Sequence, residues 1–184
     1  MLGELCGIDE AGRGPIAGDL VIAGCILNSN IDGLNDSKKL SAKKRELLYD
    51  LIIKDSLYHV VKFSPKLIDD NGISWCLKQG LESIMKNLKC KEYLFDGNTT
   101  FGVKGLQTMI KADGKVAEVS AASILAKVTH DRDIIEEAKK YPDYQFEKHK
   151  GYGTALNVEM IKKYGYCEIH RRSYKLKALA ATLF

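Results

Sequence analysis

The sequence contains no apolar run long enough to span a bilayer, and this absence argues against a membrane protein. Its first residues, Met1 to Cys6, include an early acid and lack the basic segment and apolar core of a signal peptide. We therefore expect a cytoplasmic protein. The five cysteines form an odd set without C-x-x-C spacing, which disfavours a disulfide framework and a zinc site and predicts reduced core thiols.

The sequence also lacks internal repeats, low-complexity tracts and linkers, so its 184 residues predict one domain over residues 1–184. A formal charge of +4 is only mildly basic and does not by itself indicate a nucleic-acid partner. The basic residues are clustered, however, and several clusters could line a phosphate track, although a solvated face explains any single one. The clusters are Lys38 and Lys39, residues 43–45, residues 148–150, and Arg171 and Arg172.

Apolar and β-branched runs predict strands between helices with apolar stripes. Strands are expected at 5–8, 20–27 and 57–63, as an antiparallel meander whose first two members flank a glycine-rich loop, with short strands at 93–95 and 108–110. Helices are expected at 41–54, 73–88, 116–140, 154–164 and 171–183. Ser41 and Thr154 are suited to cap two of them, and Pro142 to end the long one. This mixture indicates an α/β or α+β protein built in layers.

Acidic side chains follow predicted strands at three places. Asp9 and Glu10 end the first apolar run, and each of Asp96 and Asp113 begins an Asp-Gly pair after a short strand. Neighbouring acids raise each other's pKa unless a cation neutralises them. If all four lie at one edge of the sheet, they form a pocket suited to two Mg²⁺ or Mn²⁺ ions about 4 Å apart. For the first pair alone, a hairpin turn with exposed acids is the plainer interpretation.

Seven motifs, in this order and over nearly the whole chain, resemble the ribonuclease HII family. They are GIDEAGRGP at 7–15, DSKKLS at 36–41, FDGN at 95–98, KADGK at 111–115, SAASILAKVTHD at 120–131, HKGYGT at 149–154 and HRRS at 170–173. The resemblance implies an α/β fold of the ribonuclease H type, with a mixed five-stranded sheet flanked by helices and a C-terminal helical segment at about 142–184. The related ribonuclease HIII type is disfavoured, because it has a different loop after its first acids.

The resemblance also implies the activity. Asp9, Glu10, Asp96 and Asp113 correspond to the four catalytic, metal-binding carboxylates of an endoribonuclease. Such enzymes hydrolyse the phosphodiester 5′ of ribonucleotides in duplex DNA and cut the RNA of RNA·DNA hybrids, leaving 3′-OH and 5′-phosphate ends. One ion activates water and the other stabilises the leaving oxygen. The associated processes are ribonucleotide excision repair and DNA replication.

Selectivity for ribose requires a group that senses a single 2′-OH. The family arrangement corresponds here to Gly12, Arg13 and Gly14, whose backbone groups would bond the 2′-OH, and to Tyr152, whose ring would stack on the adjacent deoxyribose. Glycines let backbone N–H groups approach a ligand closely, and arginine offers a planar fork of donors suited to phosphate. The alternative for Tyr152 is an ordinary half-buried loop aromatic.

Further substrate contacts have plainer alternatives. Lys38 and Lys39 fit phosphate ligands by charge and loop position, but a solvated helix start explains either one equally well. Ser120 and Ser123 are expected to contact the DNA backbone, whereas close packing of small helix residues on the sheet is the competing interpretation.

The C-terminal motifs are less informative. His170 fits a structural cap, and Arg171 or Arg172 a DNA contact. The sequence departs from the family pattern in three places. His130 stands where arginine is common, Gln145 replaces a frequent glycine, and the segment after residue 173 lacks a Gly-Pro pair.

Three other functions are compatible with parts of the sequence. A non-catalytic nucleic-acid binding module is the main alternative, although four carboxylates facing phosphate would repel it without metal. A small-molecule phosphatase would be expected to carry a Walker-type loop, which is absent. The last residues, including Leu183 and Phe184, loosely resemble peptides that dock on sliding clamps, but an apolar helix end is the simpler interpretation. A monomer is expected to suffice for action on a duplex.

Overall fold

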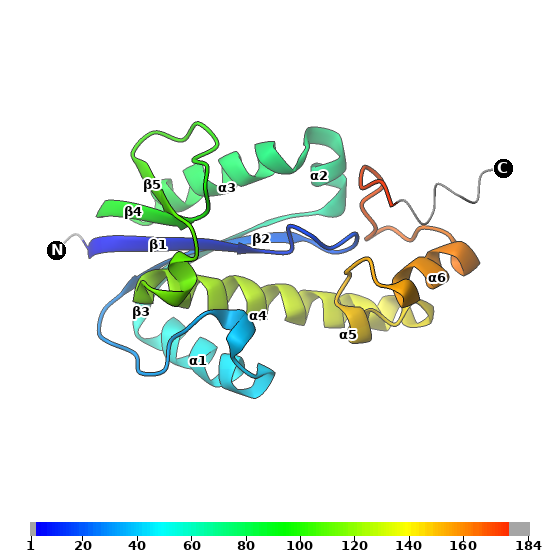
Figure 1. Cartoon of the computed structure of the whole chain (residues 1–184), viewed down its shortest axis with the longest axis horizontal. Coiled ribbons are helices and arrows are strands. Elements are labelled where there is room, and N and C mark those ends of the chain that lie inside the picture. The colour runs from blue at the N-terminus through cyan, green and yellow to red at the C-terminus, as the bar shows by residue number, and fades with distance from the viewer. Residues whose placement is uncertain (1–2, 177–184) are drawn as a thin grey trace.

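The computed structural model describes residues 3–176, and its centre is one mixed sheet (Figure 1). The strand order is β3-β2-β1-β4-β5. The pairs β1–β2 and β2–β3 are antiparallel, whereas β4 runs parallel to both β1 and β5. The strands are β1 (Gly3–Ala11), β2 (Leu20–Leu27), β3 (Ser56–Phe63), β4 (Cys90–Asp96) and β5 (Leu106–Met109). The predicted meander and the mixed five-stranded sheet are confirmed.

Helices cover both faces of this sheet. α3 packs on one face, and α4 with α1 packs on the other (Figure 1). The helices are α1 (Ala42–Lys54), α2 (Pro65–Asn71), α3 (Ile73–Asn87), α4 (Ala117–Lys140), α5 (Phe146–His149) and α6 (Ala155–Tyr164), with short 3₁₀ turns η1 (Ser37–Lys39), η2 (Ala112–Gly114) and η3 (Pro142–Tyr144). None of the helices within residues 3–176 has the length and apolar character needed to cross a membrane.

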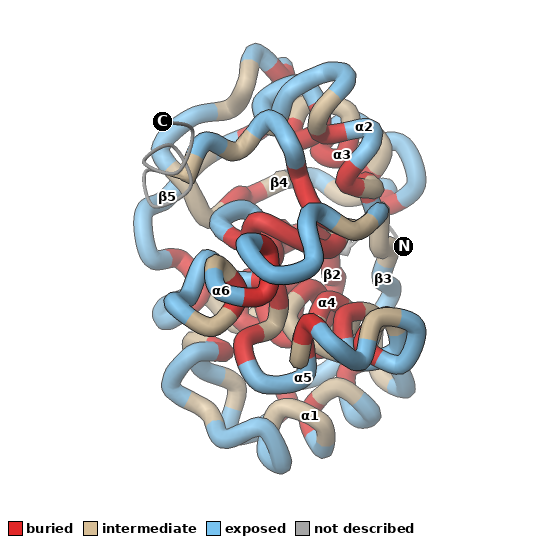
Figure 2. The backbone as a smooth tube through the Cα atoms, turned by 90° about the vertical axis from the view of Figure 1, so that its right-hand side faces the viewer, coloured by how far each residue is buried: buried red, intermediate tan, exposed pale blue. Residues whose placement is uncertain are grey.

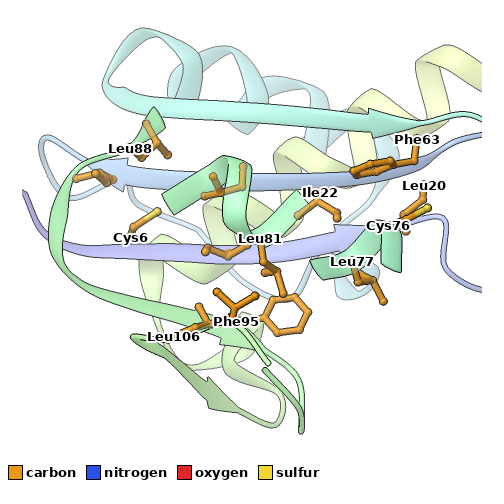
Figure 3. Packing of buried hydrophobic residues seen from close by; sticks show 14 of the residues in the cluster. Cys6, Leu20, Ile22, Phe63, Cys76, Leu77, Leu81, Leu88, Phe95 and Leu106 are labelled. Atoms are coloured by element: carbon orange, nitrogen blue, oxygen red, sulfur yellow. The ribbon is translucent and has the colours of Figure 1, made fainter. Parts of the chain in front are cut away.

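The core follows from the period of each element. Alternate residues of β1, such as Cys6 and Ile8, point toward α3, which presents Leu77 and Leu81 at helical spacing. Figure 3 shows Cys6, Leu77 and Leu81 packed with other side chains of the sheet, including Ile22 and Phe95. The opposite face of β2 meets the small residues of α4 and the apolar stripe of α1. Burial of β2 on both faces explains why its sequence is a continuous apolar run.

Side-chain caps begin several helices as expected. The hydroxyl of Ser41 accepts a hydrogen bond from the amide of Lys44, and that of Thr154 accepts one from Asn157. α2 was not predicted, although Ser64 caps it and Pro65 occupies its first turn.

The helix predicted at 171–183 is wrong for its described part. Residues 171–176 form turns, because the amide of Arg171 donates to the carbonyl of Ile16 rather than within a helix. The remainder of that prediction, at 177–183, lies outside the described residues.

A close approach of backbones joins β1 to α4. A Cβ added at Gly7 would lie 2.2 Å from the carbonyl carbon of Glu118 and 2.2 Å from the nitrogen of Val119, where no atom fits. The small residues from Ser120 to Ala126 continue this contact, and all but one of the helix positions from 119 to 128 are buried. The structure therefore supports the close-packing interpretation of these small residues.

The segment after α4 folds back toward the loop that follows β1. Ala17 forms an isolated antiparallel bridge with His170, although the two residues are far apart in sequence. Figure 2 looks onto α5 and α6, in which exposed and buried residues are mixed, and which lie in front of buried strands and of α4. The predicted C-terminal helical segment is thus present as α5 and α6, followed by turns.

Candidate metal centre and nucleic-acid interface

Three carboxylates meet at one end of the sheet. Asp9 lies near the end of β1, and Asp96 ends β4, the parallel neighbour of β1. Asp113 reaches the same point from η2. One carboxylate oxygen of each residue lies within 4.8 Å of the other two. The structure therefore brings together three of the four predicted acids, and their oxygens form a set that fits a divalent metal ion.

Glu10 lies beside this cluster and lines the same cavity. Its Oε1 is 3.6 Å from Nη1 of Arg13, whereas its Oε2 is buried and has no hydrogen-bond partner among the described residues. A buried carboxylate oxygen without a donor is costly. This orphaned oxygen is a second sign that the acid cluster is built to receive a cation.

The turn carrying Asp113 is held from two sides. Lys111 adopts a left-handed conformation, with φ 58°, and turns the chain into η2. The amide of Asp113 donates to Oδ2 of Asp96 at 3.4 Å, and its carbonyl accepts a hydrogen bond from the hydroxyl of Ser120. Ser120 is buried and donates to the backbone, so α4 fixes the position of Asp113 directly.

The electrostatics of the cluster are unfavourable without metal. Burial, followed by the charge of Glu10, raises the pKa of Asp9 well above its usual range. Burial also raises the pKa of Glu10, against the influence of Arg13. Burial and the nearby charges of Asp96 and Asp36 raise the pKa of Asp113 to about 6. A bound cation would reverse each of these penalties by favouring the ionised carboxylates.

The cavity above the acids has a volume of about 530 Å³ and a basic rim. Lys38 and Lys39 line it from η1, and both are exposed. Three further lining residues were not singled out from the sequence. Lys111 and Lys115 flank Asp113 within the KADGK motif, and Asp36 caps η1 by accepting from the amide of Lys38 at 2.9 Å. Their positions inside matched motifs were the available signal.

A second cavity of about 320 Å³ adjoins the acids and contains the glycine-rich loop. It is lined by Gly12, Arg13 and Gly14 on one side and by Tyr152 on another. A Cβ added at Gly14 would lie 3.8 Å from Cε1 of Tyr152, so loop and ring are direct neighbours. The amides of residues 12–14 donate to no acceptor within the described part of the chain. They are available to a ligand.

Two basic side chains border this cavity. The guanidinium of Arg13 turns back toward Glu10 and lies 5.8 Å from the ring centroid of Phe101. Lys127, which sequence reasoning did not select, pairs with Asp131 at 2.7 Å and lies 6.0 Å from the ring centroid of Tyr152. The sequence feature that could have identified Lys127 is its position one helical turn after Ser123.

Other predicted contacts have structural partners. The hydroxyl of Ser123 is 2.9 Å from that of Ser37, and Ser123 lines the second cavity although it is buried. His170 accepts from the amide of Cys167 at 3.1 Å, in agreement with a structural role. A DNA contact is wrong for Arg171, which is 0% exposed, whereas Arg172 is exposed.

The structure shows the surroundings of two departures from the family pattern. Gln145 adopts a left-handed conformation, with φ 54°, and glycine adopts this region without strain. His130 is buried against Gly12, and its Nε2 has no hydrogen-bond partner among the described residues.

The sheet order and an acid cluster that fits a divalent metal ion match the architecture expected of the ribonuclease H class. The family model described as Ribonuclease HII matches residues 6–177. Ribonuclease HII of Sulfurovum sp. (strain NBC37-1) is 61% identical over 181 residues, which cover 98% of this chain and 96% of the relative.

Solved structures agree with this match. The ribonuclease HII of a PCNA:RNase HII complex from Archaeoglobus fulgidus has a TM-score of 0.81 at 31% identity, and the match covers 95% of this chain and 96% of that one. Ribonuclease H2 from Pyrococcus horikoshii OT3 has a TM-score of 0.75 at 31% identity, with 93% of each chain covered. The chain belongs to the ribonuclease HII family, and it is accordingly a ribonuclease H hydrolase.

Proposed function

We propose that the protein cleaves the phosphodiester on the 5′ side of a ribonucleotide embedded in duplex DNA. It also cuts the RNA of RNA·DNA hybrids, and both reactions leave 3′-OH and 5′-phosphate ends. The observation that carries this proposal is the adjacency of two cavities. One contains Asp9, Asp96 and Asp113, and the other joins the free amides of residues 12–14 to the ring of Tyr152.

The residues that would hold Mg²⁺ or Mn²⁺ are Asp9, Glu10, Asp96 and Asp113. Converging oxygens within 4.8 Å for three of them, and the orphaned oxygen of Glu10, support this assignment. Two bound ions would supply activation of the attacking water and charge stabilisation of the leaving 3′ oxygen. Carboxylate oxygens bind both metals, so we propose Mg²⁺ or Mn²⁺ as the ion used in the cell.

The chain's own residues bind and orient the substrate. Lys38 and Lys39 at the cavity rim offer positive charge to phosphates, as Ser123 offers a hydroxyl at the second cavity. The amides of residues 12–14 donate to the 2′-OH, and Tyr152 stacks on the neighbouring deoxyribose. Ser120 acts on the substrate indirectly, because its hydroxyl is engaged by the turn that carries Asp113.

Further proposals concern context. We place residues 1–184 in one catalytic domain that acts as a cytoplasmic monomer in ribonucleotide excision repair and DNA replication. The Archaeoglobus fulgidus neighbour was solved in a complex with PCNA, which favours a sliding-clamp contact for this chain as well. The residues predicted for that contact, Leu183 and Phe184, lie outside the described residues.

The test is cleavage of a labelled DNA duplex that contains one ribonucleotide, with Mg²⁺, with Mn²⁺ and with EDTA, beside an all-DNA duplex. We expect metal-dependent cutting only at the 5′ side of the ribonucleotide. Asp9→Asn should abolish turnover, whereas the exposed Asp143→Asn should not. Duplex binding without cleavage by the unmodified protein would instead favour the non-catalytic binding module.

A further inference from the structure

Arg171 is a buried arginine whose charge is received by backbone carbonyls rather than by a carboxylate. It is 0% exposed and forms no salt bridge within residues 3–176. Nε and Nη2 donate to the carbonyl of Gly18 at 3.0 and 2.7 Å. Nη1 donates to the carbonyl of Arg13 at 3.4 Å. Burial of a guanidinium is unfavourable, so its hydrogen bonds to these two carbonyls are its main compensation.

Tyr174 completes the same arrangement. Its hydroxyl donates to the carbonyl of Arg13 at 2.9 Å and accepts from Nη1 of Arg171 at 3.2 Å. The guanidinium also lies 5.2 Å from the centroid of the Tyr174 ring, at cation–π distance. The carbonyl of Arg13 therefore receives two donors, both from the C-terminal segment.

The orientation of this carbonyl determines the orientation of the next amide. In a planar trans peptide, the C=O of one residue and the N–H of the following residue point in opposite directions. Because the carbonyl of Arg13 is drawn inward by Arg171 and Tyr174, the N–H of Gly14 points away from them. Gly14 is the loop residue that neighbours the ring of Tyr152.

The loop of Tyr152 is tied to the same segment. The carbonyl of Gly151 accepts from the amides of Ile16 and Ala17 at 2.8 and 3.2 Å. The side-chain amide of Asn157, which is 0% exposed, donates to the carbonyl of Tyr152 at 3.0 Å. These bonds join the loop after β1 and the loop of Tyr152 into one hydrogen-bonded unit.

We infer that Arg171 and Tyr174 are positioning residues for ribose selectivity, because they hold the carbonyl of Arg13 so that the amide of Gly14 is presented to the 2′-OH. Neither residue lines the cavity of the acid cluster or the cavity of the glycine-rich loop. This inference rests on the proposed function, since it assigns the origin of the 2′-OH contact. The C-terminal turns at 171–174 thus act as a support for the sugar-sensing loop.

The decisive variant is Tyr174→Phe, which removes only the hydroxyl and keeps the ring against Arg171. The matched control is Tyr166→Phe, because Tyr166 packs on His170 and its hydroxyl has no hydrogen bond among the described residues. Steady-state cleavage of the one-ribonucleotide duplex is measured for both variants, together with the Mg²⁺ concentration for half-maximal rate and the melting temperature.

We expect Tyr174→Phe to lower kcat by roughly 5- to 20-fold, the effect of losing one positioning hydrogen bond, with little change in KM. The half-maximal Mg²⁺ concentration should stay the same, which separates loop positioning from damage to the acid cluster. Tyr166→Phe should match the unmodified protein in every measurement.

An unchanged kcat for Tyr174→Phe beside an active unmodified protein would overturn the inference and leave the proposed function intact. A lower melting temperature with unchanged kcat would also overturn it, because the hydroxyl would then serve stability alone. Absence of cleavage by the unmodified protein would overturn the proposed function and the inference with it. Arg171→Lys provides a second variant, which keeps the charge but loses the fork and is expected to reduce kcat further.

Discussion

Substituting Asp113 by asparagine is predicted to stabilise the metal-free protein while abolishing its activity. Burial and the charges of Asp96 and Asp36 raise the pKa of this carboxyl from 3.8 to about 6. One pKa unit corresponds to about 1.36 kcal/mol, so ionising Asp113 in the folded state costs about 3 kcal/mol of unfolding free energy at neutral pH. Because the amide that replaces this carboxyl must still be buried, we expect a net gain of about 1–3 kcal/mol.

The pH dependence follows from the direction of this shift. The folded protein holds the Asp113 proton more tightly than the unfolded chain does, so this carboxyl destabilises the fold as pH rises from the unfolded pKa of 3.8 through about 6. The advantage of Asp113→Asn should therefore be complete near pH 7.5, decrease as pH falls through 6, and vanish near pH 4. Added Mg²⁺ should raise the melting temperature of the unmodified protein much more than that of the variant.

The assay is thermal unfolding in EDTA at several pH values, where 1 kcal/mol corresponds to about 2–4 °C for a chain of this size. Asp143→Asn is the control, because Asp143 is exposed and forms no hydrogen bond through its side chain within the described residues. Two results would refute this account of the acid cluster. One is a variant that is less stable than the unmodified protein at pH 7.5, and the other is a difference in melting temperature at pH 4 as large as that at pH 7.5.

Two further predictions concern backbone conformation. Gly12→Ala should destabilise the protein by more than about 2 kcal/mol and reduce cleavage, because φ is +84° and the new Cβ would lie 2.4 Å from the carbonyl oxygen of Asp19. Gly72→Ala, with φ +83°, ψ 154° and no atom within 4 Å, should show only the strain of a backbone region that is nearly restricted to glycine, about 1–3 kcal/mol, and equal effects of the two variants would argue against the clash. Gln145→Gly should raise stability by about 0.5–1 kcal/mol in urea unfolding, since relief at φ 54° exceeds the entropic cost of glycine. The same change at Gln79, inside α3, should lower stability by about 1 kcal/mol, and a loss at both positions would contradict the role given to φ.

Most of the fold could be predicted from local patterns. The strand at 20–27 and the helix at 42–54 have the expected bounds, because an apolar run and a serine cap are both local signals. α2 was missed because its seven residues carry too short a stripe to show a period, despite the Ser64-Pro65 start. The predicted helix at 171–183 was wrong over its described part because tertiary bonds to Ile16 and Arg13 take precedence over helical propensity there.

The part of the site that could be predicted is the set of acids that follow predicted strands, because an acid at a strand end is a local signal. The sequence predicted one pocket if Asp9, Glu10, Asp96 and Asp113 all lie at one edge of the sheet, and the oxygens of Asp9, Asp96 and Asp113 do converge. The support around the site was not predictable. Arg171 was one of two arginines predicted to contact DNA, and only the structure shows that its guanidinium is buried against the loop after β1. Partners separated by about 150 positions in the chain carry no local signal.

The close contact of Gly7 with α4 fixes the distance between the strand and the helix that support the acid cluster. β1 carries Asp9 two residues beyond this glycine, and α4 holds the turn of Asp113 through Ser120. The backbones of strand and helix touch there directly, and a Cβ added at Gly7 would lie only 2.2 Å from the backbone of the helix. A single methyl group at position 7 would therefore push strand and helix apart and separate the two supports of the acid cluster without altering any of its carboxylates. The alignment of these carboxylates therefore requires glycine, which has no Cβ, at position 7.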